Sequence, residues 1–580
     1  MITERVDDIP LLLAELEKSN LSNILSAHFP DYGNWQGADG GMVTALFLTY
    51  ILSCADHRTS HVETWASERI HTLRLCTGRP NLSAKDLTDD RLGILLDKYS
   101  DTAAWHKFET AHNKNLIQVY NLDIAKEPIR LDGMITQSHR EQGGDFQRGY
   151  SKQHRADLPQ MKTMLAAVDP YAIPLVSLTV AGNEADDGLY LPVIEQLDAT
   201  LSLKHQLFVA DSKLSSIENR SGIVCLGHYY LTPLSKKQCS TEQLDRYLSQ
   251  LATQPNLLKT LHTQDKDKQL IIKAKAFESS ETISHIIENK VPKELKKILT
   301  WEERRIIVYS PSYAQSQIKT FDKRLNRAKA ALNILFQPQQ GRKRPKTYQE
   351  TKQAVNKILK QHRVTSIIDV KIIETTWEKE VRAYLDRPAE TRTITDLSIE
   401  YSINEAEQQK QLGRMGWRVF ASNAPKEKLN TLDAVQCYRN EYRIEHKFDE
   451  RLNRVTASMP VYLNKPNRIK ALIRLLLIAL KYVSLIQMQV RQKLENTKQT
   501  LKELYPGNPG RKTDKPTNKM LLKAFEYITL VIIPLENQTI IKLTQLKPIQ
   551  LQILSLLDLS PIIYHKLNQM SFYDLDLGET

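Results

Sequence analysis

The stretch IRLDGMIT, residues 129–136, begins the part of the chain that decides its fold. It is a short and mostly apolar run that predicts a β-strand, and it carries one acid, Asp132. Four further segments follow in the order strand, strand, helix, strand. They are MKTMLAAVD (161–169), IPLVSLTVAG (173–182), LYLPVIEQLDATL (189–201) and HQLFVADSK (205–213).

This order predicts an α/β (α+β) fold with a ribonuclease-H-like core. In such a core the first strand and a later strand lie next to each other. Asp132 on the first strand and Asp211 at the end of the last one are therefore expected side by side.

A third acid, Glu445, lies in residues 429–454, which contain no Pro or Gly and so predict a helix. On that helix Tyr438, Glu441 and Glu445 fall within about 60° of one another. Glu441 is therefore an alternative to Glu445. We favour Glu445, because it alone has a tyrosine seven residues before it and a basic residue, Arg451, six residues after it.

Three carboxylates presented in this way suit hard cations, and paired Mg²⁺ ions are a standard device for in-line displacement at phosphorus. The chain is basic, with a net charge of +13 and a pI near 9.2, which favours an anionic partner such as nucleic acid. Asp169, Asp186 and Asp187 lie at strand ends or turns, where an aspartate more often stabilises the turn itself. The pattern therefore indicates DNA strand chemistry at Asp132, Asp211 and Glu445.

Several longer stretches resemble one protein family. Residues 149–197, from GYSKQHRADLPQ onward, VADSK at 209–213, and Tyr438 with Glu445 and Arg451 resemble the signatures of DDE-type insertion-sequence transposases, specifically the IS-four superfamily and its sixteen-thirty-four group. Glu441 departs from the pattern, which places Arg there. The resemblance covers nearly the whole chain, including residues 87–101, 303–332 and 504–533.

The resemblance implies a transposase that cleaves at the terminal inverted repeats of its own element and transfers the 3′-OH ends to target DNA. Asp132, Asp211 and Glu445 would be catalytic and would bind two Mg²⁺ ions, with Mn²⁺ as the substitute. It also implies a bacterial protein of the cytoplasm that joins the nucleoid when bound to DNA. Two alternatives stay open: a decayed or domesticated transposase that only binds DNA, and a ribonuclease-H-like nuclease without strand transfer.

Basic and aromatic residues near these motifs are candidate DNA contacts, although solvated surface loops and core packing are the ordinary alternatives for them. They lie in the loop after the first strand, beside the second acid, in a polar turn of the insertion and on the Glu445 helix. The resemblance makes Trp301 the candidate counterpart of a tryptophan that, in family members that pass through a hairpin, grips a flipped base. The full set is Lys152, His154, Arg155, Lys213, Trp301, Arg342, Lys343, Arg344, Tyr438, Arg443 and Arg451.

The chain divides into five expected segments. Residues 1–120 read as an N-terminal helical DNA-binding domain that recognises the element's ends, and 121–215 as the first part of the core. Because a long stretch separates the second and third acids, 216–415 is expected to be an inserted domain with strands at 222–234, 269–277, 304–311 and 366–377, and a further strand is expected just after it at 417–423. The core would resume at 416–490, and 491–580 would be a C-terminal helical domain.

Negative findings exclude other classes. The sequence has no GxxxxGK[ST], HExxH or GxSxG motif, so no nucleotide cofactor is expected. The five cysteines show no CxxC spacing and are expected to be reduced thiols. The apolar run 469–490 is interrupted by Arg474 and Lys481, so it predicts a buried core helix and no membrane partner.

Assembly follows from the chemistry. Joining two ends to one target needs two active sites, so we expect a homodimer on DNA. The C-terminal helices offer apolar surface for it, although packing within one chain is the alternative. Arg511, Lys512, Lys515 and Lys519 lie among Pro and Gly in the 508–519 loop and are expected to contact phosphates.

Overall fold

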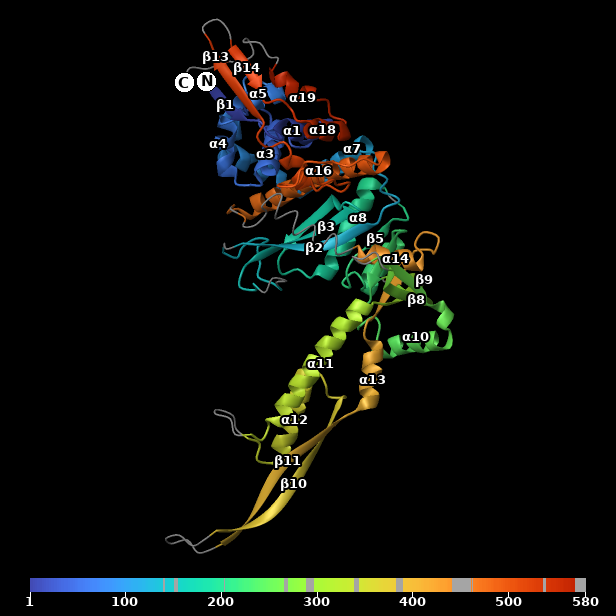
Figure 1. Cartoon of the computed structure of the whole chain (residues 1–580). Coiled ribbons are helices and arrows are strands. Elements are labelled where there is room, and N and C mark those ends of the chain that lie inside the picture. The colour runs from blue at the N-terminus through green and yellow to red at the C-terminus, as the bar shows by residue number, and fades with distance from the viewer. Residues whose placement is uncertain are drawn as a thin grey trace.

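The structure is a computed structural model, and it describes residues 1–138, 141–150, 155–202, 204–264, 270–287, 297–337, 344–381, 390–440, 461, 463–535 and 539–568. Its centre is a mixed sheet of nine strands in the order β4-β3-β2-β5-β6-β12-β9-β8-β7. Figure 1 shows this sheet between a helical body at one end and a projecting arm at the other.

The first five strands of the sheet form the ribonuclease-H-like core. β2 pairs antiparallel with β3 and parallel with β5, while β3 pairs antiparallel with β4 and β5 parallel with β6. The order of three strands, a helix and a strand that the sequence predicts is confirmed. The elements are β2 (Ile129–Gln137), β3 (Gln160–Val168), β4 (Ile173–Ala181), α8 (Tyr190–Leu201), β5 (Leu207–Val209) and β6 (Tyr229–Pro233).

The sheet continues into the segment between the second and third acids. β12 (Trp417–Ser422) pairs with β6 and with β9 (Lys297–Tyr309), which pairs with β8 (Leu270–Ile287), and β7 (Lys259–Gln264) closes the edge. α10 (Thr241–Thr253) packs at this end. The strands of the insertion thus extend the same sheet that carries Asp132 and Asp211.

One expected strand is wrong in its first half. Residues 222–225 belong to α9 (Ile217–Cys225), and only β6 is extended. The helix starts because the Ser216 side chain accepts a hydrogen bond from the backbone N–H of Asn219. Gly227, at φ +77°, then turns the chain into the strand.

The helical body joins the two ends of the chain. β1 (Ile2–Arg5) pairs with β13 (Thr529–Pro534), which pairs with β14 (Thr539–Leu543). Around them one apolar core contains side chains from both ends. The main helices are α1 (Ile9–Lys18), α2 (Leu21–His28), α3 (Gly40–Cys54), α4 (Val62–Ser67), α5 (Ile70–Thr77), α6 (Asp89–Tyr99), α7 (Thr102–Val119), α16 (Pro466–Thr497), α17 (Asn518–Lys523), α18 (Pro548–Leu556) and α19 (Ile562–His565).

α16 is the buried helix that the sequence predicts at 469–490. Nearly all of its side chains from Ile469 to Val490 are buried, and it packs against β4 and α6. Within the described part of the chain, no helix combines the length and apolarity that a membrane crossing needs.

The arm leaves the sheet after β9. α11 (Pro311–Asn333) runs outward, α12 (Tyr348–His362) packs against it, and a two-stranded ribbon of β10 (Ile368–Val381) and β11 (Glu390–Ile403) extends beyond both (Figure 1). The base of the arm has its own small core, which includes Phe321, Leu359 and Ile368. α13 (Glu405–Arg414) then leads back to β12.

Candidate active site

Asp132 and Asp211 come from neighbouring strands of the sheet. The register pairs Arg130 of β2 with Val209 of β5, and each acid lies two residues beyond its paired residue. Because the two strands are parallel, both acids reach the same level of the sheet, where β5 ends. Ligand sites of open α/β sheets form at the carboxyl ends of parallel strands.

The carboxylate of Asp211 is held by two donors. The Tyr190 hydroxyl donates to Asp211 Oδ1 at 2.7 Å, and the backbone N–H of Lys213 donates to the same oxygen at 3.0 Å. The Thr232 hydroxyl donates to the Asp211 carbonyl at 2.8 Å. No donor among the described residues binds Oδ2. The carboxylate is therefore oriented through one oxygen while the other is left for a further ligand.

Tyr190 is protonated in this setting. Burial raises the pKa of its hydroxyl, and the negative charges of Asp211 and Asp132 raise that pKa further. The side chain lies at the start of α8 and is 2 % exposed. A protonated and buried hydroxyl can only donate to Asp211, so its role is to position that carboxylate.

Asp186 is engaged by two lysines. Lys162 Nζ lies 2.8 Å from Asp186 Oδ1, and Lys213 Nζ forms an ion pair with Oδ2. Burial by itself would raise the pKa of Asp186, but hydrogen bonds from both lysines outweigh it and hold that pKa below its usual value. Asp186 thus neutralises a lysine beside Asp211, and this contact favours a structural role over metal binding.

Arg130 brings the chain toward the third acid. Its guanidinium pairs with Asp169 at 2.8 Å and donates to the Cys437 carbonyl at 2.5 Å, near the end of α14 (Thr431–Arg439). Arg130 and Asp132 lie two residues apart on one strand and so share one face of β2. The end of α14 therefore arrives at the face that carries Asp132, and Glu445 follows Cys437 by eight residues.

Several predicted residues lie outside the described residues. Of the predicted site residues in 429–454, only Tyr438 is described, and its ring lies 4.6 Å from the Phe420 ring between centroids. It is half-buried against the core, so its aromatic face is partly used in packing. The residues outside the described ranges are Lys152, His154, Arg342, Lys343, Glu441, Arg443, Glu445 and Arg451.

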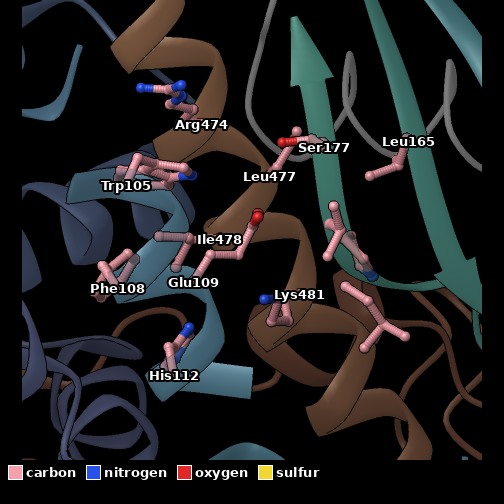
Figure 2. A pocket seen from close by; sticks show the side chains of 13 residues that line it. Trp105, Phe108, Glu109, His112, Leu165, Ser177, Arg474, Leu477, Ile478 and Lys481 are labelled. Atoms are coloured by element: carbon pink, nitrogen blue, oxygen red, sulfur yellow. The ribbon is translucent and has the colours of Figure 1, made fainter. Parts of the chain in front are cut away.

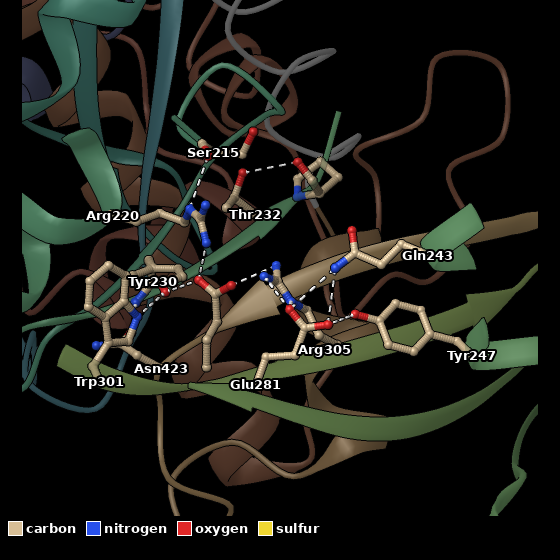
Figure 3. A network of polar contacts seen from close by, with 12 residues as sticks. Ser215, Arg220, Tyr230, Thr232, Gln243, Tyr247, Glu281, Trp301, Arg305 and Asn423 are labelled. Carbon is tan, nitrogen blue, oxygen red and sulfur yellow. Dashed lines mark hydrogen bonds and ion pairs between the residues drawn. The ribbon is translucent and has the colours of Figure 1, made fainter. Parts of the chain in front are cut away.

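Trp301 lies inside a polar network (Figure 3). It is 8 % exposed on β9, and its indole N–H donates to the Tyr230 hydroxyl at 2.9 Å. Tyr230 in turn donates to the buried Glu303. This burial favours packing over contact with a flipped base.

Arg155 and Arg344 are both exposed. Arg155 forms an ion pair with Asp157 at 2.8 Å. An exposed pair of this kind is weak and can exchange its partner for a phosphate.

The described part of the site holds only part of a metal-binding set. Across the described ranges, no group of three or more His, Cys, Asp or Glu side chains is arranged to hold a metal ion. Asp132 and Asp211 provide hard carboxylate oxygens, the ligands that Mg²⁺ and Mn²⁺ prefer. The two acids fit such a cation as a partial donor set.

A small cavity lies elsewhere, between α7, α16 and β4 (Figure 2). Its volume is about 10 Å³, and Glu109, Lys481 and Arg474 line it. It is too small for a substrate, because about this volume holds a single water molecule. We therefore assign these charges to the stability of the fold.

Sequence reasoning missed Tyr190 and Arg130. Both residues lie in stretches quoted above, but the sequence assigns neither a role, and each acquires one only when the fold brings it to Asp211 or Cys437. A polar residue at the start of an apolar helix, as in DDGLYLPVI, was the one available signal for Tyr190.

Comparison with known proteins adds a family. The family described as "Transposase DDE domain" matches residues 127–481, a range that includes Asp132, Asp211 and Glu445. A cryo-EM structure of the piggyBac transposase synaptic complex with hairpin DNA is similar at 11% sequence identity, with 84% of this chain and 82% of that chain covered and a TM-score of 0.23. No curated protein matches the chain.

Proposed function

Because the chain belongs to the transposase DDE domain family over residues 127–481, we propose that it cleaves DNA at the terminal inverted repeats of its own element and joins the 3′-OH ends to target DNA. The finer placement in the IS-four superfamily and its sixteen-thirty-four group belongs to the same proposal. The observation that carries it is the convergence of Asp132 and Asp211 at the ends of parallel strands inside the matched range.

Asp132 and Asp211, with Glu445, would hold two Mg²⁺ ions, which supply charge neutralisation at phosphorus and a water of lowered pKa. Tyr190 fixes Asp211 through Oδ1, so that Oδ2 keeps one direction during the reaction. Lys213 lies beside this carboxylate and is held by Asp186, where it can face a DNA phosphate without neutralising Asp211.

Two displacements complete the reaction. In the first, a water oxygen bonds to the phosphorus at the element's end, the P–O3′ bond breaks, and the 3′ oxygen leaves with a proton. In the second, that 3′-OH oxygen bonds to a target phosphorus and loses its proton, a target P–O3′ bond breaks, and the released target 3′ oxygen takes up a proton. The same site serves both steps, because each is an in-line displacement at a phosphodiester.

Supercoiled DNA that carries the element's ends tests the proposal. The full chain should nick it in Mg²⁺ or Mn²⁺ and join the ends to a second plasmid, and Asp132→Asn should do neither. Nicks without joined products would assign a nuclease. DNA binding without any divalent-ion-dependent nicking by the folded protein would assign a DNA-binding protein without catalysis.

A further inference from the structure

The outer face of α11 carries a line of cations. Lys319, Lys323 and Arg327 are spaced four residues apart, so they lie within about 80° of one another around the helix. All three are exposed. The buried residues of α11, among them Phe321 and Leu325, lie on the opposite side. The line therefore faces away from the core of the arm.

The composition of this face is selective. Its other exposed members near the line are uncharged, namely Ser312, Gln315, Ser316, Thr320, Asn326 and Ala330. Asp322 is the one acid on α11, and it lies about 60° outside the line. A solvated helix face normally mixes both signs of charge, and the structure records no ion pair for these three cations within the described ranges.

The arm as a whole separates its charges. α11 and α12 together carry eight lysines and arginines against two acids, whereas β10 and β11 carry seven acids against three bases. A polyanion would therefore be attracted to the helical side of the arm and repelled by the ribbon. The charge pattern thus predicts which side of the arm faces a polyanion, as well as the negative charge of the partner.

We propose that the outer face of α11, defined by Lys319, Lys323 and Arg327, binds the phosphate backbone of duplex DNA. Cations accompanied by hydroxyl and amide side chains are the donors that contact phosphates without reading bases. A protein partner fits less well, because lysine is depleted from protein interfaces and the line itself contains no apolar anchor.

The position of the face defines which DNA it meets. α11 has 23 residues and so is about 34 Å long, which corresponds to roughly ten base pairs of duplex. It starts directly after β9 and leads away from the strands that carry Asp132 and Asp211 (Figure 1). The contact would therefore fall on duplex beyond the cleaved phosphodiester. This part rests on the proposed function.

The test uses the full chain and a random-sequence duplex of about 60 base pairs. The plot of log affinity against log salt has a negative slope, and the variant K319Q/K323Q/R327Q should make that slope shallower by about 2.7, which is about 0.9 for each lost phosphate contact. The charge-conserving variant K319R/K323R/R327K should keep the slope. E374Q/E378Q/E380Q on the ribbon changes the net charge by the same magnitude with the opposite sign and should also keep the slope, because these residues do not face the phosphates.

An unchanged slope in K319Q/K323Q/R327Q overturns the proposal. If that variant instead loses a DNA-independent dimer, measured by mass, with the slope unchanged, the face belongs to a second copy's acidic ribbon and the proposal is likewise overturned. A wild-type chain that binds no DNA would contradict the proposed function itself, so the two failures are distinguishable.

Discussion

Replacing Lys481 by methionine tests how the helical body is held on the catalytic sheet. Lys481 of α16 is 4 % exposed, and its Nζ donates to Asn113 Oδ1 of α7 at 2.7 Å. Glu109 of α7 is 7 % exposed and accepts from Gln196 Nε2 of α8 at 2.9 Å. Figure 2 shows Glu109 and Lys481 extending into the space between the helices and the sheet. The two charged side chains thus lie where α7, α16 and α8 meet.

The magnitude follows from what the change leaves behind. Burial raises the pKa of Glu109, and Lys481, followed by Arg474, is the main charge that opposes this rise. Without Lys481, Arg474 is the one of these two cations that still opposes the burial of the Glu109 charge, and Asn113 Oδ1 loses the Lys481 donor. Breaking a buried pair costs about 3–5 kcal/mol, and an unsatisfied buried acceptor about 1–3 kcal/mol. Because Arg474 remains, we expect the free energy of unfolding to fall by about 3 kcal/mol.

The pH dependence has a definite sign. A carboxyl whose folded pKa is raised binds its proton more tightly in the folded state, so Glu109 makes stability fall as pH rises above about 4.3, the unfolded value, toward its folded pKa. Burial lowers the pKa of Lys481, so stability falls as pH drops below about 10.4 toward the folded pKa of Lys481. In K481M the loss in free energy of unfolding near neutral pH should become smaller as the solution is acidified, because Glu109 then takes up a proton and is no longer a buried charge.

Urea unfolding followed by tryptophan fluorescence measures the change, since Trp105 lines the same cavity. K493M on the same helix is the matched control, because Lys493 pairs with Asp558 at the surface and its loss should cost less than about 1 kcal/mol. The double variant E109Q/K481M should recover part of the loss. A K481M loss below about 1 kcal/mol, or full additivity in the double variant, would refute the reasoning.

Four further predictions concern the site and its DNA. Asp132→Asn, Asp211→Asn and Glu445→Gln should each abolish DNA nicking, measured on gels, because the amide keeps the shape of the side chain and removes its charge. DNA binding, measured by fluorescence anisotropy, should persist in all three variants. An inactive Glu441→Gln together with an active Glu445→Gln would reverse our choice of the third acid. Tyr190→Phe should weaken Mn²⁺ binding, measured by calorimetry, about tenfold. The control Tyr120→Phe removes a similar 2.7 Å hydrogen bond, to Glu15, and should leave Mn²⁺ affinity unchanged. Equal Mn²⁺ affinities of the two variants would contradict the positioning role of Tyr190. Alanine at Arg511, Lys512, Lys515 and Lys519 should lower the salt slope by about 0.9 per phosphate contact, and an unchanged slope would exclude that loop. Mass measurement should detect a dimer on end DNA, and strand transfer by a complex of one chain and one end would contradict it.

The core was predictable because its signals are local. Short apolar runs in the order of residues 129–213 determine the strand sequence, and the acids are placed by the strands that carry them. Residues 222–225 were misread as a strand because an apolar run is ambiguous between helix and strand, and the capping contact of Ser216 decides the matter. Residues 469–490 were predicted to be a buried helix, and they lie within α16.

The partners of the site were not predictable from the sequence. Tyr190 binds Asp211 across 21 residues of chain, and Arg130 binds the Cys437 carbonyl across 307. Such contacts depend on how helices return to the sheet. Trp301 illustrates the same limit, because its burial depends on Tyr230 of another strand.

The insertion is tied to the catalytic strand by buried charge (Figure 3). Glu303 of β9 is 0 % exposed and pairs with Arg305 at 2.6 Å and with Arg220. Arg220 also donates to the Ser215 carbonyl at 3.0 Å, four residues after Asp211. A buried charge network tolerates little displacement, because every lost contact leaves an uncompensated charge.

The consequence concerns the arm. α11 starts immediately after β9, two residues beyond the end of the strand that carries Glu303 and Arg305. A rigid network between Ser215 and β9 therefore fixes the start of the arm relative to Asp211. Flexibility at this junction would let the outer face of α11 bind DNA without restraining the scissile phosphate. Because paired charges hold the junction, phosphate contacts on the arm can determine where the duplex lies relative to Asp132 and Asp211. Binding energy from contacts far from the reaction then contributes to positioning the scissile phosphate.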